Sequence, residues 1–171
     1  MSGSFVNIAG YRFVDIPDRD ELRQPFRDIC QKLNLKGTIL IANEGINFFL
    51  SGTQESIDEY LKFIQEDVRF QNIPIKISYS DYQPFRRMNV RLKNEIISIG
   101  LDHIKPTVKT GEEITPTDFK KLLDDGEDIL VLDTRNDYEI RIGTFQMATE
   151  LNIKTFRDFP RAVDELSLIH I

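Results

Sequence analysis

The chain has 171 residues, of which 40% are hydrophobic and 29% charged, and a formal net charge of −6. This composition is that of a folded globular protein with room for one domain or two small ones, and no apolar stretch is long enough to span a membrane, so no membrane partner is expected. A single cysteine excludes an intrachain disulfide and suits a reducing compartment, so we expect a cytoplasmic location.

The charge is divided unevenly along the chain. Residues 1–100 carry 13 Lys and Arg against 13 Asp and Glu, whereas residues 101–171 carry 9 against 15. Because an acidic protein as a whole repels the phosphate backbone, it does not bind nucleic acid generically. An RNA partner would have to be held by a local basic patch, which we expect in the first half.

Hydrophobic periodicity predicts that residues 1–100 form a β-α-β-β-α-β unit, the order of a ferredoxin-like domain. The first helix opens after Pro17-Asp18, and its regular part is expected to begin near Pro25, as a first-turn proline. Cys30 belongs to the apolar stripe of this helix and is expected to be buried and structural. Thr53 is predicted to cap the second helix. The predicted strands are 5–16, 38–42, 46–50 and 74–79.

A turn in the middle of this unit is the first candidate site. The segment Ala42-Asn43-Glu44-Gly45-Ile46-Asn47 joins two predicted strands, and Asn and Gly supply the backbone conformations that such a connection needs. Two interpretations stay open. The segment is either a hairpin turn without a further role or part of a pocket lined by Asn43, Glu44, Gly45 and Asn47.

The segment from residue 81 to residue 100 is predicted to add a β-hairpin, with strands at 88–92 and 96–99. Four basic residues gather in it beside Tyr82 and Phe85, namely Arg86, Arg87, Arg91 and Lys93. Cations interleaved with aromatic rings suit single-stranded RNA, because cations contact phosphates and rings stack on bases. A solvated strand face is the alternative explanation of these cations.

Residues 101–114 are predicted to be a linker, because they are polar, contain Pro106 and Gly111 and lack periodicity. His103 in this linker has no second ligand at metal-binding spacing, so it is expected to be an ordinary surface histidine and no metal site is predicted. A helix is then predicted to begin with Thr115 at its N-cap and Pro116 in its first turn.

A short apolar run, Ile129–Leu132, predicts a strand buried on both faces, and a charged loop follows it. Asp133 ends the run at the expected carboxyl edge of an α/β sheet, where binding sites form. Arg135, Glu139 and Gly143 follow at spacings typical of a loop fixed by charge-assisted hydrogen bonds. A strand followed by a capped turn is the plainer interpretation, and the spacing alone favours it.

These motifs resemble one family. The segments Asp133–Glu139 and Gly143–Phe145, with Ala148, are similar to the first signature of a rhodanese domain. More narrowly, the chain resembles the rhodanese-like tRNA uridine hydroxylases, because the match continues through Thr155–Arg157 and because Ala42–Asn47 is similar to an element of that family. The resemblance implies an α+β ferredoxin-like domain over residues 1–100 and the first part of an α/β rhodanese-like domain over residues 115–171. It also implies oxygen-dependent hydroxylation of the wobble uridine of tRNA to 5-hydroxyuridine, with molecular oxygen as co-substrate and any cofactor unknown.

The resemblance assigns roles to residues and also marks a gap. Asp133, Arg135 and Glu139 would shape the active site, and the basic residues of 86–93 would hold tRNA. The rhodanese cysteine loop would follow the region at which this chain ends, and Cys30 does not correspond to it, so no catalytic residue is expected in the chain. We therefore expect an inactive fragment whose incomplete rhodanese half self-associates through exposed strand edges.

Two other functions stay open. A rhodanese signature by itself predicts a sulfurtransferase that carries sulfur as a cysteine persulfide, although such a carrier needs no ferredoxin-like module that faces RNA. A non-catalytic RNA-binding or regulatory module is the other alternative, and it applies if the protein ends at Ile171.

Overall fold

A computed structural model describes residues 4–97, 99–101 and 111–167. Of these, the residues up to Ile96 form one compact unit, and the residues after it form a second. Two sequence predictions fall wholly or largely outside the described residues: the linker at 101–114 and the surface position of His103.

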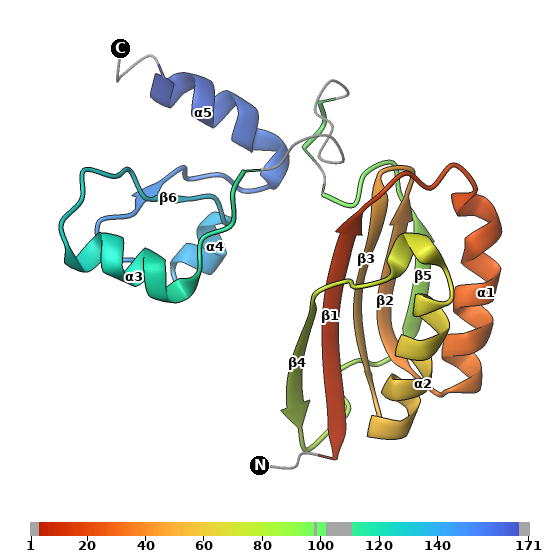
Figure 1. The fold of residues 1–171 in the computed structure, drawn as a ribbon. Coiled ribbons are helices and arrows are strands. Elements are labelled where there is room, and N and C mark those ends of the chain that lie inside the picture. The colour runs from red at the N-terminus through yellow and green to blue at the C-terminus, as the bar shows by residue number, and fades with distance from the viewer. Residues whose placement is uncertain (1–3, 98, 102–110, 168–171) are drawn as a thin grey trace. The chain divides into compact units, whose positions relative to one another are not determined.

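The first unit is a five-stranded sheet whose strands lie in the order β4-β1-β3-β2-β5. Both long helices lie on the same face of this sheet, which leaves the other face open (Figure 1). The β-α-β-β-α-β order predicted from the sequence is confirmed. Its elements are β1 (Phe5–Phe13), α1 (Arg19–Lys32), β2 (Lys36–Ala42), β3 (Gly45–Gly52), α2 (Gln54–Gln65), the short 3-10 helix η1 (Val68–Phe70), β4 (Ile75–Ser80) and β5 (Met88–Leu92).

Alternation along the strands builds the core of this unit. Side chains at every second strand position point toward the helices and are buried, as Val6 and Ile8 are on β1. They meet the apolar stripes of the helices, where Phe26 contacts the rings of Tyr60 and Phe70. Thr53 caps α2 as predicted, because its side chain accepts a hydrogen bond from the Ser56 backbone N–H.

The hairpin predicted at 88–99 is wrong. Residues 88–92 do form a strand, but β5 pairs in parallel with β2 at the far edge of the sheet from β4. The chain after β5 does not return as a second strand, because the Ile96 N–H donates to Glu44 Oε1 at 2.8 Å and the Ile96 side chain is buried. Residue 98, in the predicted return strand, lies outside the described residues.

The predicted position of Pro25 is also wrong. Helix α1 begins at Arg19, so Pro25 stands inside it and not in its first turn. An internal proline removes one backbone hydrogen bond and usually disfavours a helix. Here Phe26 and Cys30, on the same helix, are both buried in the core, and this packing outweighs the missing hydrogen bond.

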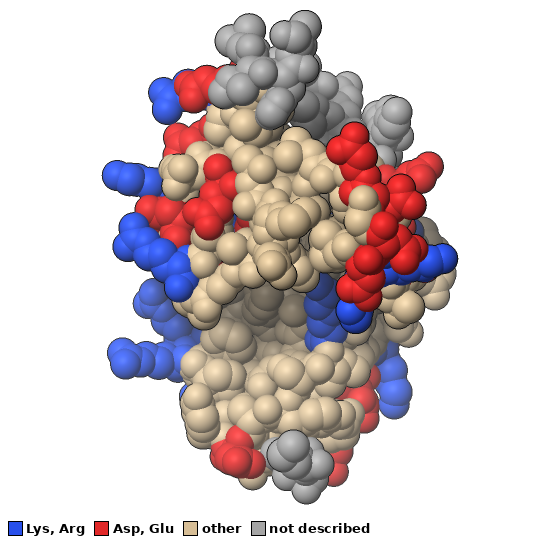
Figure 2. Space-filling view, turned by 90° about the vertical axis from the view of Figure 1, so that its left-hand side faces the viewer, with Lys and Arg blue, Asp and Glu red and all other residues tan. Residues whose placement is uncertain are grey.

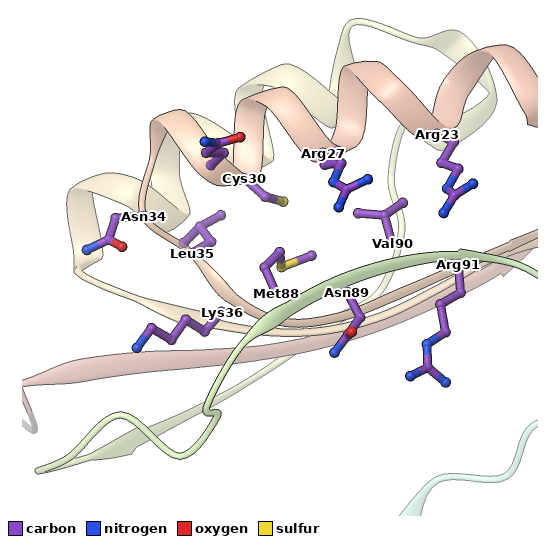
Figure 3. Close-up of a pocket in the computed structure, with 11 residues that line it drawn as sticks. Arg23, Arg27, Cys30, Asn34, Leu35, Lys36, Met88, Asn89, Val90 and Arg91 are labelled. Carbon is purple, nitrogen blue, oxygen red and sulfur yellow. The ribbon is translucent and has the colours of Figure 1, made fainter.

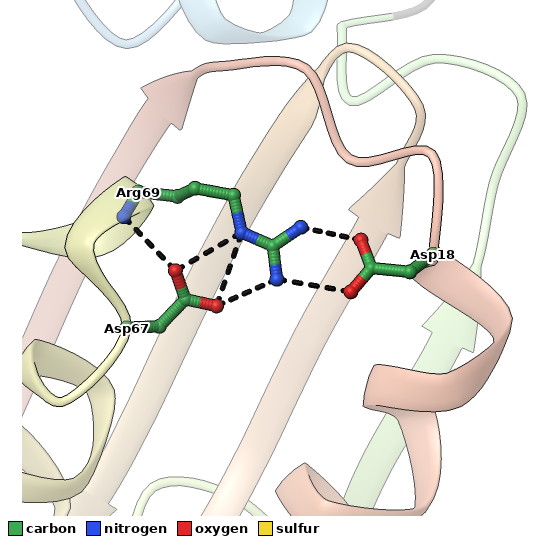
Figure 4. A network of polar contacts seen from close by, with 3 residues as sticks. All are labelled: Asp18, Asp67 and Arg69. Carbon is green, nitrogen blue, oxygen red and sulfur yellow. Dashed lines mark hydrogen bonds and ion pairs between the residues drawn. The ribbon is translucent and has the colours of Figure 1, made fainter.

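One ion-pair network joins two distant parts of the first unit (Figure 4). The Arg69 guanidinium donates to both carboxylate oxygens of Asp18, which precedes α1, and of Asp67, which caps η1. These charge-assisted hydrogen bonds lower the pKa of each carboxyl group below its ordinary value. The network ties the start of α1 to the segment that leads into β4.

The second unit carries shorter elements around a two-stranded parallel sheet. Strand β6 pairs with β7 through the partners Leu132 with Thr149 and Asp133 with Glu150. Thr115 caps the first helix as predicted, and Pro116 stands at its first position. The elements are α3 (Pro116–Asp124), β6 (Leu132–Asp133), α4 (Asp137–Ile140), β7 (Thr149–Glu150), the 3-10 helix η2 (Phe156–Asp158) and α5 (Phe159–Ser167).

The predicted strand at 129–132 is shorter and less buried than expected. Only Leu132 and Asp133 pair as a strand, whereas Ile129 and Leu130 are exposed. Within the described ranges β6 has one strand neighbour, β7. No strand among these residues covers the other edge of β6, which a strand buried on both faces would require. None of the helices described is both long and apolar enough to cross a membrane.

Candidate nucleic-acid interface

A basic groove runs along one edge of the first unit, between α1 and β5 (Figure 3). Arg23 and Arg27 are four residues apart on α1, so they lie on the same side of the helix, and both point toward β5. Lys36 at the start of β2 and Arg91 on β5 line the strand side of the groove, and their side chains point away from α1. The groove encloses about 470 Å³. Four cations from three elements therefore line one edge of this unit, two on the helix and two on the strands.

The lining of this groove contains no Asp or Glu. Its floor is apolar, and three amides, those of Gln31, Asn34 and Asn89, add polar groups around it. Within the residues described, none of the four cations forms an ion pair with a carboxylate. Such a concentration of positive charge in a chain of net charge −6 is suited to an anionic ligand.

The four cations predicted to bind RNA do not act as one cluster. Arg91 lines the groove, whereas Arg86 and Arg87 are exposed in the segment just before β5. Lys93 follows the strand, and its backbone N–H donates to the Ile41 carbonyl at 2.8 Å. The structure thus keeps Arg91 in the groove and leaves the other three around it.

The sequence interpretation missed Arg23, Arg27 and Lys36. Their meeting with Arg91 depends on the parallel pairing of β2 with β5, in which Gly37 lies opposite Met88. The one local signal was the Arg23/Arg27 spacing on the polar side of the first helix. By itself that spacing is typical of any solvated helix face.

The candidate turn at 43–47 fastens the end of the sheet. The Asn43 carbonyl accepts from the Ile16 N–H at 2.8 Å, and the Glu44 carbonyl accepts from the Val14 N–H at 3.0 Å. Glu44 also binds the Ile96 backbone through its side chain. Asn47 does not join these contacts but lies on the open face of the sheet, opposite Tyr11 and Leu40.

Gly45 completes this turn for a steric reason. Its φ is +153°, and a Cβ added there would lie 2.1 Å from the carbonyl oxygen of Arg12. Only glycine fits such a close approach of two strands without displacing the backbone. The contacts of Asn43, Glu44 and Gly45 with the described residues hold the fold together.

In the second unit, the loop after β6 is fixed by charge-assisted hydrogen bonds. Asp133 is buried, and its Oδ2 accepts from Arg135 Nη2 at 2.6 Å and from Thr144 Oγ1 at 2.8 Å. Arg135 also donates to the Gly143 carbonyl at 2.7 Å, which closes the loop. The Arg135 guanidinium, assisted by Thr144, holds the pKa of the Asp133 carboxyl well below its usual range.

Glu139 plays a separate part in the same loop. Its Oε2 accepts from the Asn136 backbone N–H at 3.1 Å, which forms a capping box at the start of α4. The predicted trio of Asp133, Arg135 and Glu139 therefore divides into an ion pair and a helix cap. Both lie at the carboxyl end of β6, where the sequence placed them.

Cys30 lies in the wall of the basic groove but is fully buried. Burial raises the pKa of its thiol to about 12. A thiol of that kind is neutral at physiological pH and is a poor nucleophile. The expectation that Cys30 is a buried structural residue is confirmed.

The first unit is thus a ferredoxin-like domain of the acylphosphatase type with a basic edge. Residues 5–96 match the family model described as the UPF0176 acylphosphatase like domain, and the chain belongs to the UPF0176 family.

Two curated relatives are named tRNA uridine(34) hydroxylase. The protein from Cupriavidus metallidurans is 46% identical over 165 residues, and that from Cupriavidus taiwanensis is 45% identical over 163 residues. These matches cover 94% and 92% of this chain but 58% of each relative. Among solved structures, the BLUF protein BlrB is 18% identical with a TM-score of 0.47, and the match covers 58% of this chain and 81% of that one.

Proposed function

We propose that this chain is the amino-terminal part of an enzyme that hydroxylates the wobble uridine of tRNA to 5-hydroxyuridine, with molecular oxygen as co-substrate. In this proposal the basic groove holds the phosphate backbone of the tRNA, and the reaction takes place in the cytoplasm. The observation that carries it is the groove itself, which Arg23, Arg27, Lys36 and Arg91 line without a carboxylate among the described residues. The names of the curated relatives support the choice of tRNA and of the reaction.

The groove supports an RNA ligand more than a small anion. Two of its cations stand on the helix and two on strands, so they spread along an edge and do not surround a single point. Arg86, Arg87 and Lys93 flank β5 and extend the positive charge beyond the groove. A row of separated cations matches the regular spacing of phosphates along a nucleic-acid strand.

We place the first part of a rhodanese-like domain at residues 115–171, after a linker at 101–114 and a ferredoxin-like domain at 1–100. The Asp133–Arg135 pair and the closed loop to Gly143 would hold one wall of the active site. In this proposal the reactive cysteine lies in the part of the full-length protein that corresponds to the unmatched part of the relatives, because this chain matches 58% of their length. The isolated 171-residue chain is then inactive and exposes strand edges that favour self-association.

The reaction is tested on tRNA from a strain in which the reading frame that carries this chain is deleted. Mass spectrometry of the digested tRNA should show loss of 5-hydroxyuridine at the wobble position and its return on complementation. Unchanged 5-hydroxyuridine would overturn the proposed reaction. The purified full-length protein should also fail to transfer sulfur from thiosulfate to cyanide, and efficient transfer would favour the sulfurtransferase.

The isolated chain offers two further tests. The purified 171-residue chain should give no 5-hydroxyuridine when it is incubated with tRNA and oxygen, and turnover would contradict the placement of the reactive cysteine. Light scattering should detect species larger than the monomer. A strictly monomeric chain would contradict the proposed self-association.

A further inference from the structure

The strands that build the open face of the five-stranded sheet contribute no acidic side chain to it. None of the five strands contains Asp or Glu, in a chain that has 28 acidic residues. The register places Lys76, Ala9, Phe49, Thr38 and Asn89 side by side in one row across this face. In the view of Figure 2 the lower part of the surface is mainly uncharged, with Lys, Arg, Asp and Glu all at its margins.

Two large aromatic rings stand exposed on this face. Phe49 on β3 is 51% exposed, and Tyr11 on β1 is 50% exposed. Tyr11 lies opposite Asn47, two residues from Phe49, so the two rings are diagonal neighbours on one surface. These half-exposed rings form an apolar platform on this face, and the Tyr11 ring also makes an edge contact with the Phe13 ring, with centroids 6.0 Å apart.

A third ring turns part of this platform into a hollow of about 380 Å³. Phe85 and Pro84 come from the segment that connects β4 to β5, and they line the hollow together with Phe49 and Ala9. Gln83 fixes this segment, because its side-chain amide donates to the Ser51 carbonyl at 3.2 Å and its Oε1 accepts from the Phe85 N–H at 3.2 Å.

The rim of the hollow is polar and positively charged. Asn7, Lys76 and Ser78 line it from the two neighbouring strands β1 and β4, and no carboxylate joins them. An aromatic floor with amide, hydroxyl and ammonium groups at the rim matches the chemistry of a nucleobase and its phosphate. A protein partner with an apolar patch would not require the ammonium group.

The hollow and the basic groove share no lining residue, but one row of residues across the sheet connects them. Asn89 lines the groove and stands in the same row as Phe49, two strands away, which is about 10 Å at the usual strand spacing. A single strand whose backbone follows the groove can therefore turn a base onto the platform.

We propose that the open sheet face binds an unpaired base of single-stranded RNA, stacked on Phe49 between Phe85 and Tyr11, with Lys76 contacting a phosphate. The identity of the ligand as RNA rests on the proposed function. This surface binds a base while the groove binds phosphates. The two together allow the domain to distinguish single-stranded from fully paired RNA.

The chain contains no tryptophan, so Phe49→Trp provides a unique fluorescent reporter on this face. The probe is a hexauridylate oligonucleotide, and the comparison is a duplex RNA of the same length. Hexauridylate should quench the tryptophan emission of the 171-residue chain, because a stacked base contacts the indole ring, whereas the duplex should leave it unchanged. Equal quenching by both, or by neither, overturns the proposal.

A loss-of-ring variant tests the same contact without a reporter. Phe49→Ala should weaken hexauridylate binding about tenfold, and Phe49→Tyr should retain it, because only the ring is needed for stacking. The matched control is Tyr79→Ala, which removes an exposed ring from β4 on the opposite face, where Tyr79 is paired with Val6. Equal losses in Phe49→Ala and Tyr79→Ala would overturn the proposal.

Two outcomes identify another occupant of this face. Quenching of the Phe49→Trp emission that grows with protein concentration and without RNA means that a second copy covers the face, and it overturns the proposal. The proposed reaction fails separately. If hexauridylate quenches the reporter while the deletion strain keeps its 5-hydroxyuridine, the face binds RNA and the reaction is wrong. If the modification is lost but no RNA quenches the reporter, only the base-binding proposal fails.

Discussion

Leu40 on β2 and Arg91 on β5 lie opposite each other in a parallel pairing of two strands that are far apart in the sequence. This pairing makes β5 the edge strand beside α1 and places Arg91 at the same groove as Arg23 and Arg27. A hairpin return after β5 would have covered this edge. The basic groove therefore exists because β5 joins β2 and has no further strand beyond it among the residues described.

If this groove holds phosphates, the removal of a single basic side chain should change how RNA affinity depends on salt concentration. Arg27→Ala and Arg91→Ala should each weaken binding of a tRNA transcript and lower the slope of log affinity against log salt concentration by about 0.7 to 1. The measurement is a fluorescence anisotropy titration of the 171-residue chain at several salt concentrations. Lys62→Ala, an exposed cation on α2, is the control and should change neither quantity. Identical slopes for all variants would contradict a role of the groove.

The sequence was informative where structure depends on neighbours in the chain. Thr53 and Thr115 were predicted as helix caps because a side-chain oxygen and a backbone N–H three residues later suffice to form a cap. The groove could not be predicted in this way. It requires the register between β2 and β5, which is set by packing over more than 45 residues of sequence separation. The Asp133 loop was predictable, because the side-chain hydrogen bonds that fix it join residues no more than eleven positions apart.

Gly45 belongs to the segment Ala42–Asn47, which resembles an element of the hydroxylase family, and we expect the role of this glycine to be steric. Gly45→Ala should destabilise the first unit by about 2 kcal/mol or more, because the new methyl group would meet the Arg12 carbonyl and because φ is positive. Chemical denaturation followed by circular dichroism measures this loss. Gly111→Ala is the matched control: no atom lies within 4 Å of its added Cβ, so the change should stay within about 0.5 kcal/mol. A fully stable Gly45→Ala protein with impaired RNA binding would instead favour a direct role of the turn in the site.

Cys30 should be inert in the folded protein. Burial raises the pKa of its thiol to about 12, so almost no thiolate exists at pH 8. We expect negligible reaction with an aromatic disulfide reagent in native buffer and complete reaction of one thiol after denaturation. Cys30→Ala should retain RNA binding, at a loss of stability of about 1 kcal/mol that reflects a small cavity. Rapid labelling of the native protein at pH 8 would contradict the burial of this side chain.

The Asp133–Arg135 pair predicts how the second unit responds to acid. The folded-state pKa of the Asp133 carboxyl lies below the ordinary value of about 3.9 for Asp, so the ionised carboxylate stabilises the fold above that pH. The stabilisation is lost progressively as the pH falls below about 4, because protonation removes the charge that binds Arg135 and Thr144. Asp133→Asn should therefore raise amide hydrogen exchange in residues 133–150 at neutral pH.

The difference from the unmodified chain should shrink as the pH falls, because both proteins then have an uncharged side chain at this position. Hydrogen exchange measured by mass spectrometry, corrected for the intrinsic pH dependence of exchange, tests this convergence. Asp137→Asn is the matched control, since the Asp137 carboxylate forms one ion pair among the described residues, with the exposed Arg141 at 3.3 Å, and the change should have little effect at any pH. If Asp133→Asn and Asp137→Asn behaved alike at neutral pH, the loop after β6 would be held by its backbone turns, and the ion pair would have no structural role there.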